Sequence, residues 1–511
     1  MSAPLAQVHP SVVHMLAAAA GAAPEAEALV QGENRLTYRE YLNCVAAFAS
    51  ELAAGGVTGE RVATVLPNSI DACIAAFGIL AAGAQHVPLN PLYTARELGE
   101  ILTDARPRVL LAAAGAASAL APVAKAAGVD TIVALGAGAR DLAATRGTAV
   151  PLERLPEPDA LAILQYTGGT TGRAKGVNLS HRSIATNVAQ REGLLPTGSG
   201  ERILCAMPLF HAYAMAMGLF LAANCRGCLV VLPRYQPETL LAAIGEERIT
   251  IFPGSPTIFV GLMAHPHFAR TDWSRVHTCY SGAAPLAEKI LARWEAAVGA
   301  PILEGYGQTE AGPVLSFNPR AGVRKPGSVG IAVAATEIQI VDVETGTRLL
   351  AAGERGEIRA RGPQIMQGYR NLPQETAEAL RGGWLYTGDI GELDTEGYLY
   401  IRDRRKDMVI VGGYNVYPRE IEEVLFAHPA VLDAAAVGAP DDYKGEIVRA
   451  YVMLRPAAQT SEEELLAHCR ANLAKYKVPA TIEQLEAIPK TAVNKTDKQA
   501  LRRRASGVAG R

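Results

Sequence analysis

The chain has 511 residues, more than one simple core can organise, so two or more domains are expected. Hydrophobic residues make up 49% of the chain and charged residues 20%, as in folded globular proteins and unlike disordered ones. The net charge of −2 excludes a general electrostatic attraction to nucleic acid.

The cysteines and the two ends of the chain indicate the cellular compartment in which the protein is expected. The seven cysteines are scattered and odd in number, which argues against a disulfide framework. Cys225 and Cys228 form a lone CxxC without partners for a metal or redox role, so both are expected to be small buried residues. The N-terminus has no cationic leader and the C-terminus is no peroxisomal signal, which favours a cytoplasmic protein.

An uncharged run covers residues 203–225 and is long enough to span a bilayer. Polar and helix-breaking residues interrupt it, namely Pro208, His211, Tyr213 and Asn224. We therefore predict a buried strand, a loop and a helix that line a pocket, and no transmembrane segment.

In chain order, the first 60 residues read as a helical lead-in. Thr37 followed by Glu40 forms a capping box for a helix that runs to about Gly55. Strands are expected at residues 62–66, 85–89, 109–112 and 131–134, with an apolar helix at 70–82. This alternation predicts a parallel sheet covered on both faces.

A second α/β run follows, with strands expected at residues 229–232, 249–252 and 278–281. From about residue 327 the pattern changes to short strands at 338–341 and 357–361 among glycines, which favours antiparallel strands or a small barrel. Residues 402–407 are almost wholly charged, as in a solvated linker or hinge. The last hundred residues predict a small α/β domain, with helices at 419–427 and 461–473 and strands at 434–437 and 448–454.

Residues 166–177 read YTGGTTGRAKGV and lie between a buried strand and a helix expected at 180–191. Glycines let the backbone approach a ligand, and successive N–H groups of such a turn bind anions. The stretch lacks the Walker A spacing, but its lysine and hydroxyls suit a polyphosphate. The residues expected to contact the phosphates or a bound metal are Thr167, Gly168, Gly169, Thr170, Thr171, Gly172 and Lys175.

Further small-residue and acidic motifs lie downstream. Gly282, Ala283 and Ala284 follow a strand, and small side chains there let a flat ring lie against the backbone. Residues 304–310 read EGYGQTE, a glycine-containing stretch that ends in the acid Glu310.

These motifs together resemble, in order and over essentially the whole chain, the AMP-forming adenylating enzymes, and are most similar to bacterial medium- and long-chain fatty-acid CoA ligases. The resemblance implies a large mixed α/β N-terminal domain at residues 1–402, made of two doubly wound subdomains and a small β-barrel. It also implies a hinge at 403–407 and a small mobile α/β domain at 408–511. The family form of the glycine-rich turn has Ser at Gly168 and Pro at Ala174.

The resemblance also assigns roles to single residues. It places Tyr306 and Gly307 beside adenine with the 282–284 turn, Thr309 on the α-phosphate, and Thr170 and Glu310 on Mg²⁺. Asp389 would accept hydrogen bonds from the ribose hydroxyls, and Arg404 would contact ribose or phosphate. His211 would border the carboxylate end of the acid site.

The family pattern assigns Lys406 to the pivot and Gly412 and Gly413 to a turn that faces the arm of coenzyme A. Lys495 would bridge the attacking carboxylate and the α-phosphate, offsetting charge in the transition state. The usual form of this last loop has Gly where the chain has Asn494, and asparagine also tolerates positive φ.

The predicted activity is therefore ATP-dependent formation of an acyl-adenylate and then an acyl-CoA, with Mg²⁺. Residues 209–221 carry no charge and Gly261 offers no cation for a dicarboxylate, which favours a medium- or long-chain fatty acid, with an aryl acid such as a cinnamate as the alternative. An adenylating enzyme that loads a carrier protein, a luciferase-like oxygenase and a non-catalytic nucleotide-binding protein are the other classes considered. The sequence leaves open whether the protein forms a homodimer.

Overall fold

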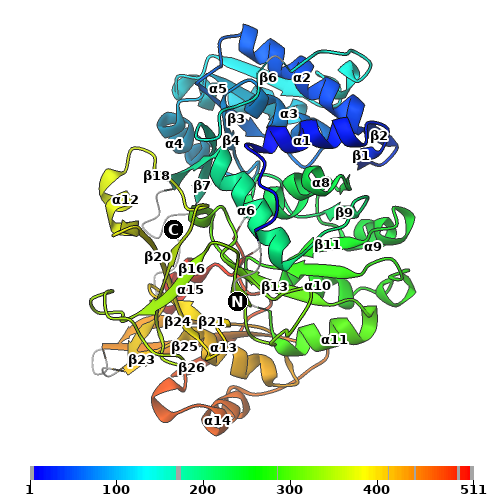
Figure 1. The fold of residues 1–511 in the computed structure, drawn as a ribbon. Coiled ribbons are helices and arrows are strands. Elements are labelled where there is room, and N and C mark those ends of the chain that lie inside the picture. The colour runs from blue at the N-terminus through cyan, green and yellow to red at the C-terminus, as the bar shows by residue number, and fades with distance from the viewer. Residues whose placement is uncertain are drawn as a thin grey trace. The chain divides into compact units, whose positions relative to one another are not determined.

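The computed structural model describes residues 5–152, 154–167, 174–284, 286–411, 414–441, 445–491 and 495–506 (Figure 1). By contacts between backbones the chain divides into two compact units. The first comprises Met1–Ile338 and Ala360–Tyr386, and the second comprises Gln339–Arg359 and Thr387–Arg511. The predicted mixed α/β fold, with a large N-terminal and a small C-terminal domain, is confirmed.

The first unit contains a seven-stranded sheet that matches the predicted βαβ run. Its strands lie in the order β18 (Gly368–Tyr369), β8 (Lys175–Ser180), β7 (Leu161–Thr167), β4 (Gln85–Pro88), β3 (Arg61–Val65), β5 (Val109–Ala113) and β6 (Thr131–Leu135). The pairings from β7 through β4, β3 and β5 to β6 are parallel, whereas β8 pairs antiparallel with both β7 and β18.

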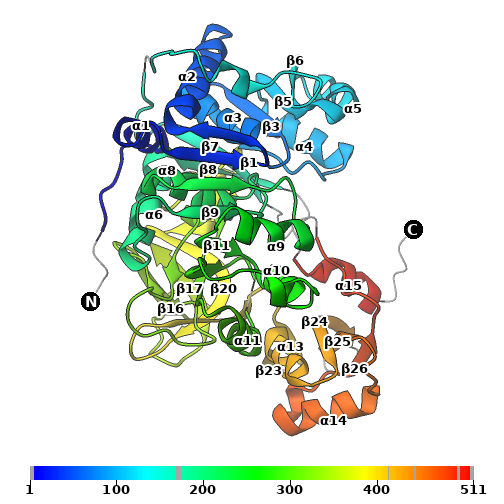
Figure 2. The same cartoon turned by 90° about the vertical axis from the view of Figure 1, so that its right-hand side faces the viewer.

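Helices cover both faces of this sheet. Successive side chains of a strand point to opposite faces, so each face needs its own cover. Val62 packs into the cluster that contains α2 (Tyr38–Ala54) and α3 (Ile70–Ala81), whereas Ala63 packs into the cluster that contains α4 (Ala95–Ala105) and α5 (Ala114–Ala126). In Figure 2, α4 and α5 lie on the opposite side of β3 and β5 from α1 (Val12–Ala22). The capping box of Thr37 and Glu40 that the sequence predicts is present at the start of α2, which ends at Ala54.

A nine-stranded sheet forms the rest of the first unit's framework. Its strands lie in the order β15 (Ile331–Ala332), β14 (Ser316–Phe317), β13 (Ile302–Tyr306), β12 (Thr278–Ser281), β11 (Ile251–Gly254), β9 (Arg202–Cys205), β10 (Cys228–Val231), β1 (Glu27–Gln31) and β2 (Asn34–Thr37). The remaining helices of this unit are α6 (His181–Leu194), α7 (Ala212–Ala214), α8 (Phe220–Cys225), α9 (Pro237–Glu246), α10 (Pro256–Met263), α11 (Glu288–Val298) and α12 (Pro373–Ala379).

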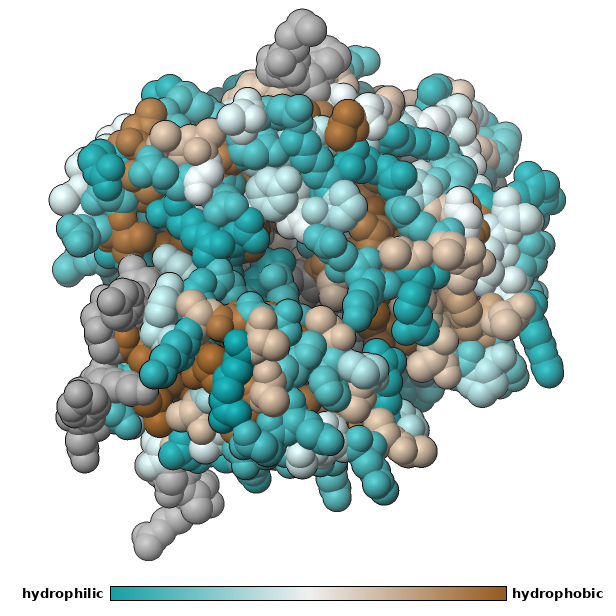
Figure 3. Space-filling view, turned by 90° about the horizontal axis from the view of Figure 1, so that it is seen from below, coloured by the Kyte–Doolittle hydropathy of each residue, from teal (hydrophilic) through white to brown (hydrophobic). Residues whose placement is uncertain are grey.

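The uncharged run 203–225 forms β9, a loop, α7, a π-helix at Met215–Leu219 and α8. The predicted order of strand, loop and helix is confirmed, and the pocket that they would line stays a prediction. Its side chains are mostly buried in the core. None of the helices among the described residues combines the length and apolar composition needed to cross a membrane. On the face drawn in Figure 3, hydrophilic side chains cover most of the surface, and apolar ones lie in small groups.

A third sheet has the predicted short strands after residue 327. Its order is β16 (Glu337–Val341), β17 (Gly356–Arg361), β20 (Trp384–Leu393) and β19 (Leu380–Arg381), with β21 (Leu399–Arg404) beside β20. The pairings of β20 with β19 and with β21 are antiparallel. Closure of these strands into a barrel stays a prediction.

The second unit carries its own sheet and core. The sheet order is β23 (Tyr414–Val416), β22 (Val409–Val411), β25 (Gly445–Leu454) and β24 (Val431–Asp441), with β26 (Thr481–Gln484) beside β25. The helices are α13 (Pro418–Ala427), α14 (Glu462–Asn472) and α15 (Lys498–Ala505). The predicted hinge at 403–407 covers the end of β21 and the turn that follows it, inside this unit. Its role as a hinge and the boundary at 402 stay predictions.

Candidate active site

The two ends of the predicted phosphate turn are held together by a β-hairpin. Thr167 ends β7 and Lys175 begins β8, and the two residues face each other in the antiparallel pairing. A Cβ at Gly176 would lie 2.9 Å from a terminal methyl of Leu164, so a larger residue there would have to displace that side chain. The other predicted residues of this turn, Gly168, Gly169, Thr170, Thr171 and Gly172, lie outside the described residues.

Tyr369 joins the phosphate turn to the predicted metal-binding carboxylate. The ammonium of Lys175 lies 5.1 Å from the centre of the Tyr369 ring, within range of a cation–π interaction. The Tyr369 hydroxyl donates to Glu310 Oε1 at 2.9 Å. Burial, and then the Glu310 carboxylate, raise the pKa of Tyr369 well above its ordinary value, so the phenol stays protonated as a donor.

Glu310 lies in a 3₁₀ turn, Thr309–Ala311, that directly follows the loop after β13. The Met366 N–H donates to the Glu310 carbonyl at 2.9 Å and fixes the turn against the segment that leads to β18. Glu310 is thus oriented through both its carboxylate and its carbonyl, while the roles of Thr309 and Glu310 stay predictions.

The small-residue turn and the Tyr306 motif follow neighbouring parallel strands. Ser281 in β12 pairs with Glu304 in β13, so the turn at 282–284 and Tyr306–Gly307 leave the sheet at the same edge. The buried Glu304 carboxylate accepts a hydrogen bond from the Leu286 N–H at 3.1 Å, which ties the turn to β13. Ligands of open α/β sheets bind at this carboxyl edge.

Two backbone features at this edge require small residues. A Cβ at Gly307 would lie 1.9 Å from the Pro313 carbonyl oxygen, so only glycine fits. Ala283 has a φ of +67°, a conformation that is uncommon for alanine and often found at binding sites. Ala284 continues the turn without adding bulk.

His211 caps the short helix α7, and its Nδ1 accepts a hydrogen bond from the Tyr213 N–H at 3.3 Å. The Tyr213 ring lies against Gly282, where an added Cβ would come within 2.8 Å of the ring. The predicted carboxylate end of the acid site is thus in contact, through Tyr213, with the turn predicted to hold adenine.

In the second unit, the predicted ribose and phosphate contacts face each other across two strands. Asp389 in β20 pairs with Arg404 in β21, and the Arg404 Nε lies 3.5 Å from Asp389 Oδ1. The carboxylate side chain is 13% exposed and the guanidinium 53%, so the cation reaches into solvent while the acid is held.

Lys495 interacts electrostatically with both Arg404 and Asp389. Its N–H donates to Thr491 Oγ1 at 3.2 Å, and the Thr491 N–H donates to its carbonyl at 2.7 Å. Burial, and then Arg404, lower the pKa of the Lys495 ammonium to about 8, although Asp389 opposes this shift. Asn494, Gly412 and Gly413 lie outside the described residues.

The fit of Mg²⁺ can be judged from the oxygen donors present. Among the described residues, no group of three or more His, Cys, Asp or Glu side chains could hold a metal ion. Mg²⁺ that arrives with ATP needs only one or two carboxylates, because phosphates and water supply the other ligands. The oriented Glu310 carboxylate fits that requirement.

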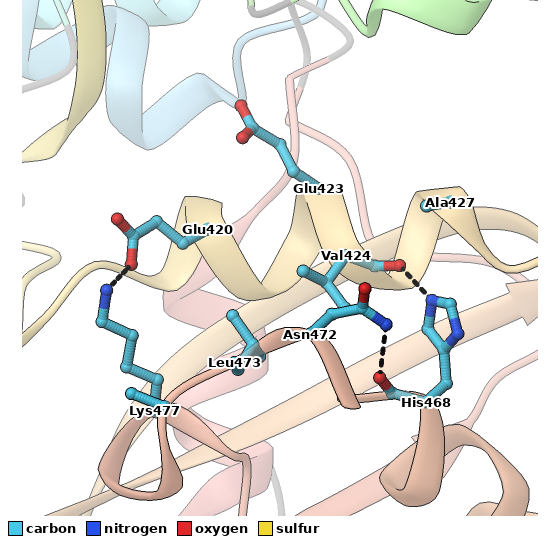
Figure 4. A pocket seen from close by; sticks show the side chains of 9 residues that line it. Glu420, Glu423, Val424, Ala427, His468, Asn472, Leu473 and Lys477 are labelled. Atoms are coloured by element: carbon cyan, nitrogen blue, oxygen red, sulfur yellow. Dashed lines mark hydrogen bonds and ion pairs between the residues drawn. The ribbon is translucent and has the colours of Figure 1, made fainter. Parts of the chain in front are cut away.

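Two cavities lie away from the predicted residues. One, of about 390 Å³, lies between α13 and α14 and is shown in Figure 4, where Lys477 bonds to Glu420 and His468 to the Val424 carbonyl. The other, of about 640 Å³, lies in the first unit beside the residues that follow β3 and β5. Neither is lined by a residue that the sequence singled out.

The structure adds residues that sequence reasoning did not assign. Tyr369 has no role assigned from the sequence, and its contact with Glu310 depends on the pairing of β18 with β8. Arg191 of α6 is 1% exposed and lies 3.9 Å, through its Nη1, from the Met217 sulfur in the uncharged run. The sequence offers no local signal for either contact.

Comparison with known proteins decides the family. Residues 16–370 match the AMP-binding enzyme family, and residues 420–495 match the C-terminal domain of AMP-binding enzymes. The chain belongs to the AMP-binding enzyme family. The predicted enzyme class, an AMP-forming acid–CoA ligase that uses ATP and CoA as co-substrates, is thereby confirmed.

Relatives and neighbours agree with this assignment. The chain is 36% identical to a long-chain-fatty-acid–CoA ligase of Bacillus subtilis (strain 168), covering 92% of this chain and 90% of that protein. It is also 36% identical to a feruloyl-CoA synthase of an Amycolatopsis species, covering 94% and 96%. The ATP-bound structure of MatB from Rhodopseudomonas palustris superposes with a TM-score of 0.90 at 31% identity, covering 97% and 98%.

Proposed function

We propose that this AMP-binding enzyme activates an acid with an apolar body, a medium- or long-chain fatty acid or an aryl acid, and transfers it to coenzyme A. The observation that carries the proposal is the contact of Lys175, Tyr369 and Glu310, which sets a cation and an oriented carboxylate beside the ends of the glycine-rich turn. The names of the two relatives support both kinds of acid.

In the first half-reaction, the acid's carboxylate attacks the α-phosphorus of ATP, and pyrophosphate leaves. Lys175 and the glycine-rich turn hold the phosphates, Thr309 donates to the α-phosphate, and Asp389 accepts from the ribose hydroxyls. Lys495, as a cation, offsets the charge that accumulates on the phosphate oxygens. Mg²⁺, held through Glu310 and Thr170, would supply further neutralisation of that charge.

In the second half-reaction, the thiol of coenzyme A attacks the acyl carbon of the adenylate, and AMP leaves. Rotation about the turn at Lys406 would withdraw Lys495 and bring Gly412 and Gly413 toward the thiol. The chemistry needs no protein nucleophile, because positioning and electrostatics carry both steps. A cytoplasmic location is part of this proposal, since all seven cysteines are free thiols.

The experiment is pyrophosphate release measured over a panel of fatty and aryl acids, with and without CoA. Release on one group of acids, with acyl-CoA formed only when CoA is added, is the expected result. Release without any thioester would replace CoA by a carrier protein or another acceptor. No release on any acid of the panel would overturn the proposal.

A further inference from the structure

Within the first unit, a polar cluster is buried beneath the run predicted to hold the acid. Arg191 of α6 is 1% exposed, and its guanidinium lies 5.8 Å from the centre of the Tyr280 ring. The Arg191 Nε and the Tyr213 hydroxyl are both buried, and neither has a hydrogen-bond partner among the described residues. Buried polar groups are rarely left unpaired, so such groups call for an explanation.

One side of the guanidinium has a structural role. The Arg191 Nη2 pairs with the carboxylate of Glu192 and donates to Thr197 Oγ1 at 3.3 Å. Glu192 also accepts from the Thr197 N–H at 2.9 Å, so this ion pair fastens the end of α6 to the following loop. These contacts account for Nη2 but leave the rest of the guanidinium without an oxygen partner among the described residues.

The other side of the guanidinium faces Met217, a side chain that a ligand could displace. The Arg191 Nη1 lies 3.9 Å from the sulfur of Met217, which is a weak acceptor. Methionine is unbranched and has three rotatable bonds, so it adapts easily to a ligand. Met217 lies in the π-helix Met215–Leu219, and such turns occur often at functional sites.

The cluster is continuous with the predicted acid site. The Tyr213 N–H bonds to His211, which is predicted to border the acid's carboxylate, and the Tyr213 ring packs on Gly282. Burial raises the pKa of Tyr213 above its ordinary value, so its hydroxyl stays protonated and can donate as well as accept. The charge of Arg191 acts on the Tyr213 hydroxyl and opposes this rise of its pKa, so His211, Tyr213 and Arg191 form one continuous group of neighbours.

We propose that Arg191 and Tyr213 form a specificity site that hydrogen-bonds a neutral oxygen atom at the distal end of the acid, an inference that rests on the proposed function. Such an oxygen is a hydroxyl, ether or carbonyl on an aryl ring or at the end of an alkyl chain. The site takes a neutral group and not a second carboxylate, because Glu192 already balances the charge of Arg191.

The experiment compares acids that differ by one oxygen, namely 4-hydroxycinnamate with cinnamate and 10-hydroxydecanoate with decanoate. We expect kcat/KM for acyl-CoA formation to favour the oxygenated member of at least one pair by tenfold or more, because a buried site built for a hydroxyl rejects the analogue that lacks it. Tyr213→Phe should reduce this ratio about tenfold. The control Tyr41→Phe, which removes a buried hydroxyl that donates to the Cys73 carbonyl, should leave the ratio unchanged.

Equal kcat/KM within both pairs would overturn the inference, as would a Tyr213→Phe enzyme in which both members of a pair fall by the same factor. Equilibrium dialysis of the acids without turnover separates this result from failure of the proposed function. Preferential binding of the oxygenated acid with no thioester product would support the specificity site and overturn the proposed reaction alone. Equal binding within both pairs would overturn the site.

Discussion

The hydroxyl of Tyr369 donates a hydrogen bond to the carboxylate of Glu310 at 2.9 Å, although the two residues are 59 positions apart in the chain. Tyr369 is held by the pairing of β18 with β8, and Glu310 by the turn after β13. The bond therefore joins the two sheets of the first unit at the point where ATP is proposed to bind. The same ring carries the Lys175 ammonium on its face.

Replacing Tyr369 by phenylalanine tests this bond. The variant keeps the ring beneath Lys175 but removes a hydrogen bond to a charged group, which is worth roughly 1.5–3 kcal/mol. We expect kcat/KM for ATP in the adenylation step, followed by ATP–pyrophosphate exchange, to fall about tenfold or more. Tyr369→Leu, which also removes the ring, should fall further, and equal activity of wild type and Tyr369→Phe would rule out a role for the bond.

The low pKa of Lys495 predicts a pH dependence. Because burial and Arg404 lower this pKa to about 8, the ammonium is charged below pH 8 and loses its proton above it. The proposed role needs the cation, so kcat/KM of adenylation should be constant on the acid side and fall about tenfold per pH unit above pH 8. A profile measured from pH 6.5 to 9.5 without a decline near pH 8 would contradict this role.

Two variants separate the charge of Lys495 from its other effects. Arginine stays protonated over this range, so Lys495→Arg should lose the decline near pH 8 whatever its absolute rate. Lys495→Ala should abolish adenylation but still form acyl-CoA from supplied acyl-adenylate, because the second step does not use the lysine. Normal adenylation by the alanine variant would remove Lys495 from the site.

Local signals account for what the sequence could predict of the fold. The capping box of Thr37 and Glu40 involves residues three positions apart, so the start of α2 is readable from the sequence alone. The hairpin of β1 and β2 was missed, since residues 1–60 read as a helical lead-in. Its place is fixed by pairing with β10, where Leu29 faces Leu229, and no local pattern encodes that contact.

At the site, too, local motifs could be predicted from the sequence, whereas contacts between distant segments could not. Glycines and acids such as Gly307 and Glu310 stand in motifs with fixed spacing, so their positions could be predicted. The contact of Tyr369 with Glu310 and that of Arg191 with Met217 could not be predicted, because each joins residues of different elements. The charge-free run at 209–221 suggested a wholly apolar acid site, whereas α6 supplies a buried cation beside Met217.

The proposed hinge is tested at Lys406. Its N–H makes no hydrogen bond with any described residue, whereas the neighbouring Arg405 N–H donates to the Gly388 carbonyl at 2.9 Å. Lys406→Pro therefore restricts φ without removing a bond of this turn. We expect adenylation within about twofold of wild type and at least a tenfold loss of thioester formation.

Lys406→Ala is the matched control, because it removes the same charge but leaves the backbone free to rotate. It should retain much more of the second step than the proline variant does. Equal thioester formation by the proline and alanine variants would exclude rotation about this position.

The last prediction concerns the backbone of the Tyr306 motif. Gly307→Ala would place a Cβ 1.9 Å from the Pro313 carbonyl oxygen, a backbone atom that cannot turn aside. We expect a loss of roughly 2–4 kcal/mol of stability or a displaced turn, seen as a lower melting temperature and weaker ATP binding. Gly115→Ala in α5 is the control: nothing lies within 4 Å of its Cβ, so helix propensity should leave stability equal or higher by up to about 1 kcal/mol. If both variants melted and bound ATP as wild type does, the close passage of Gly307 past Pro313 would not exist in the folded enzyme.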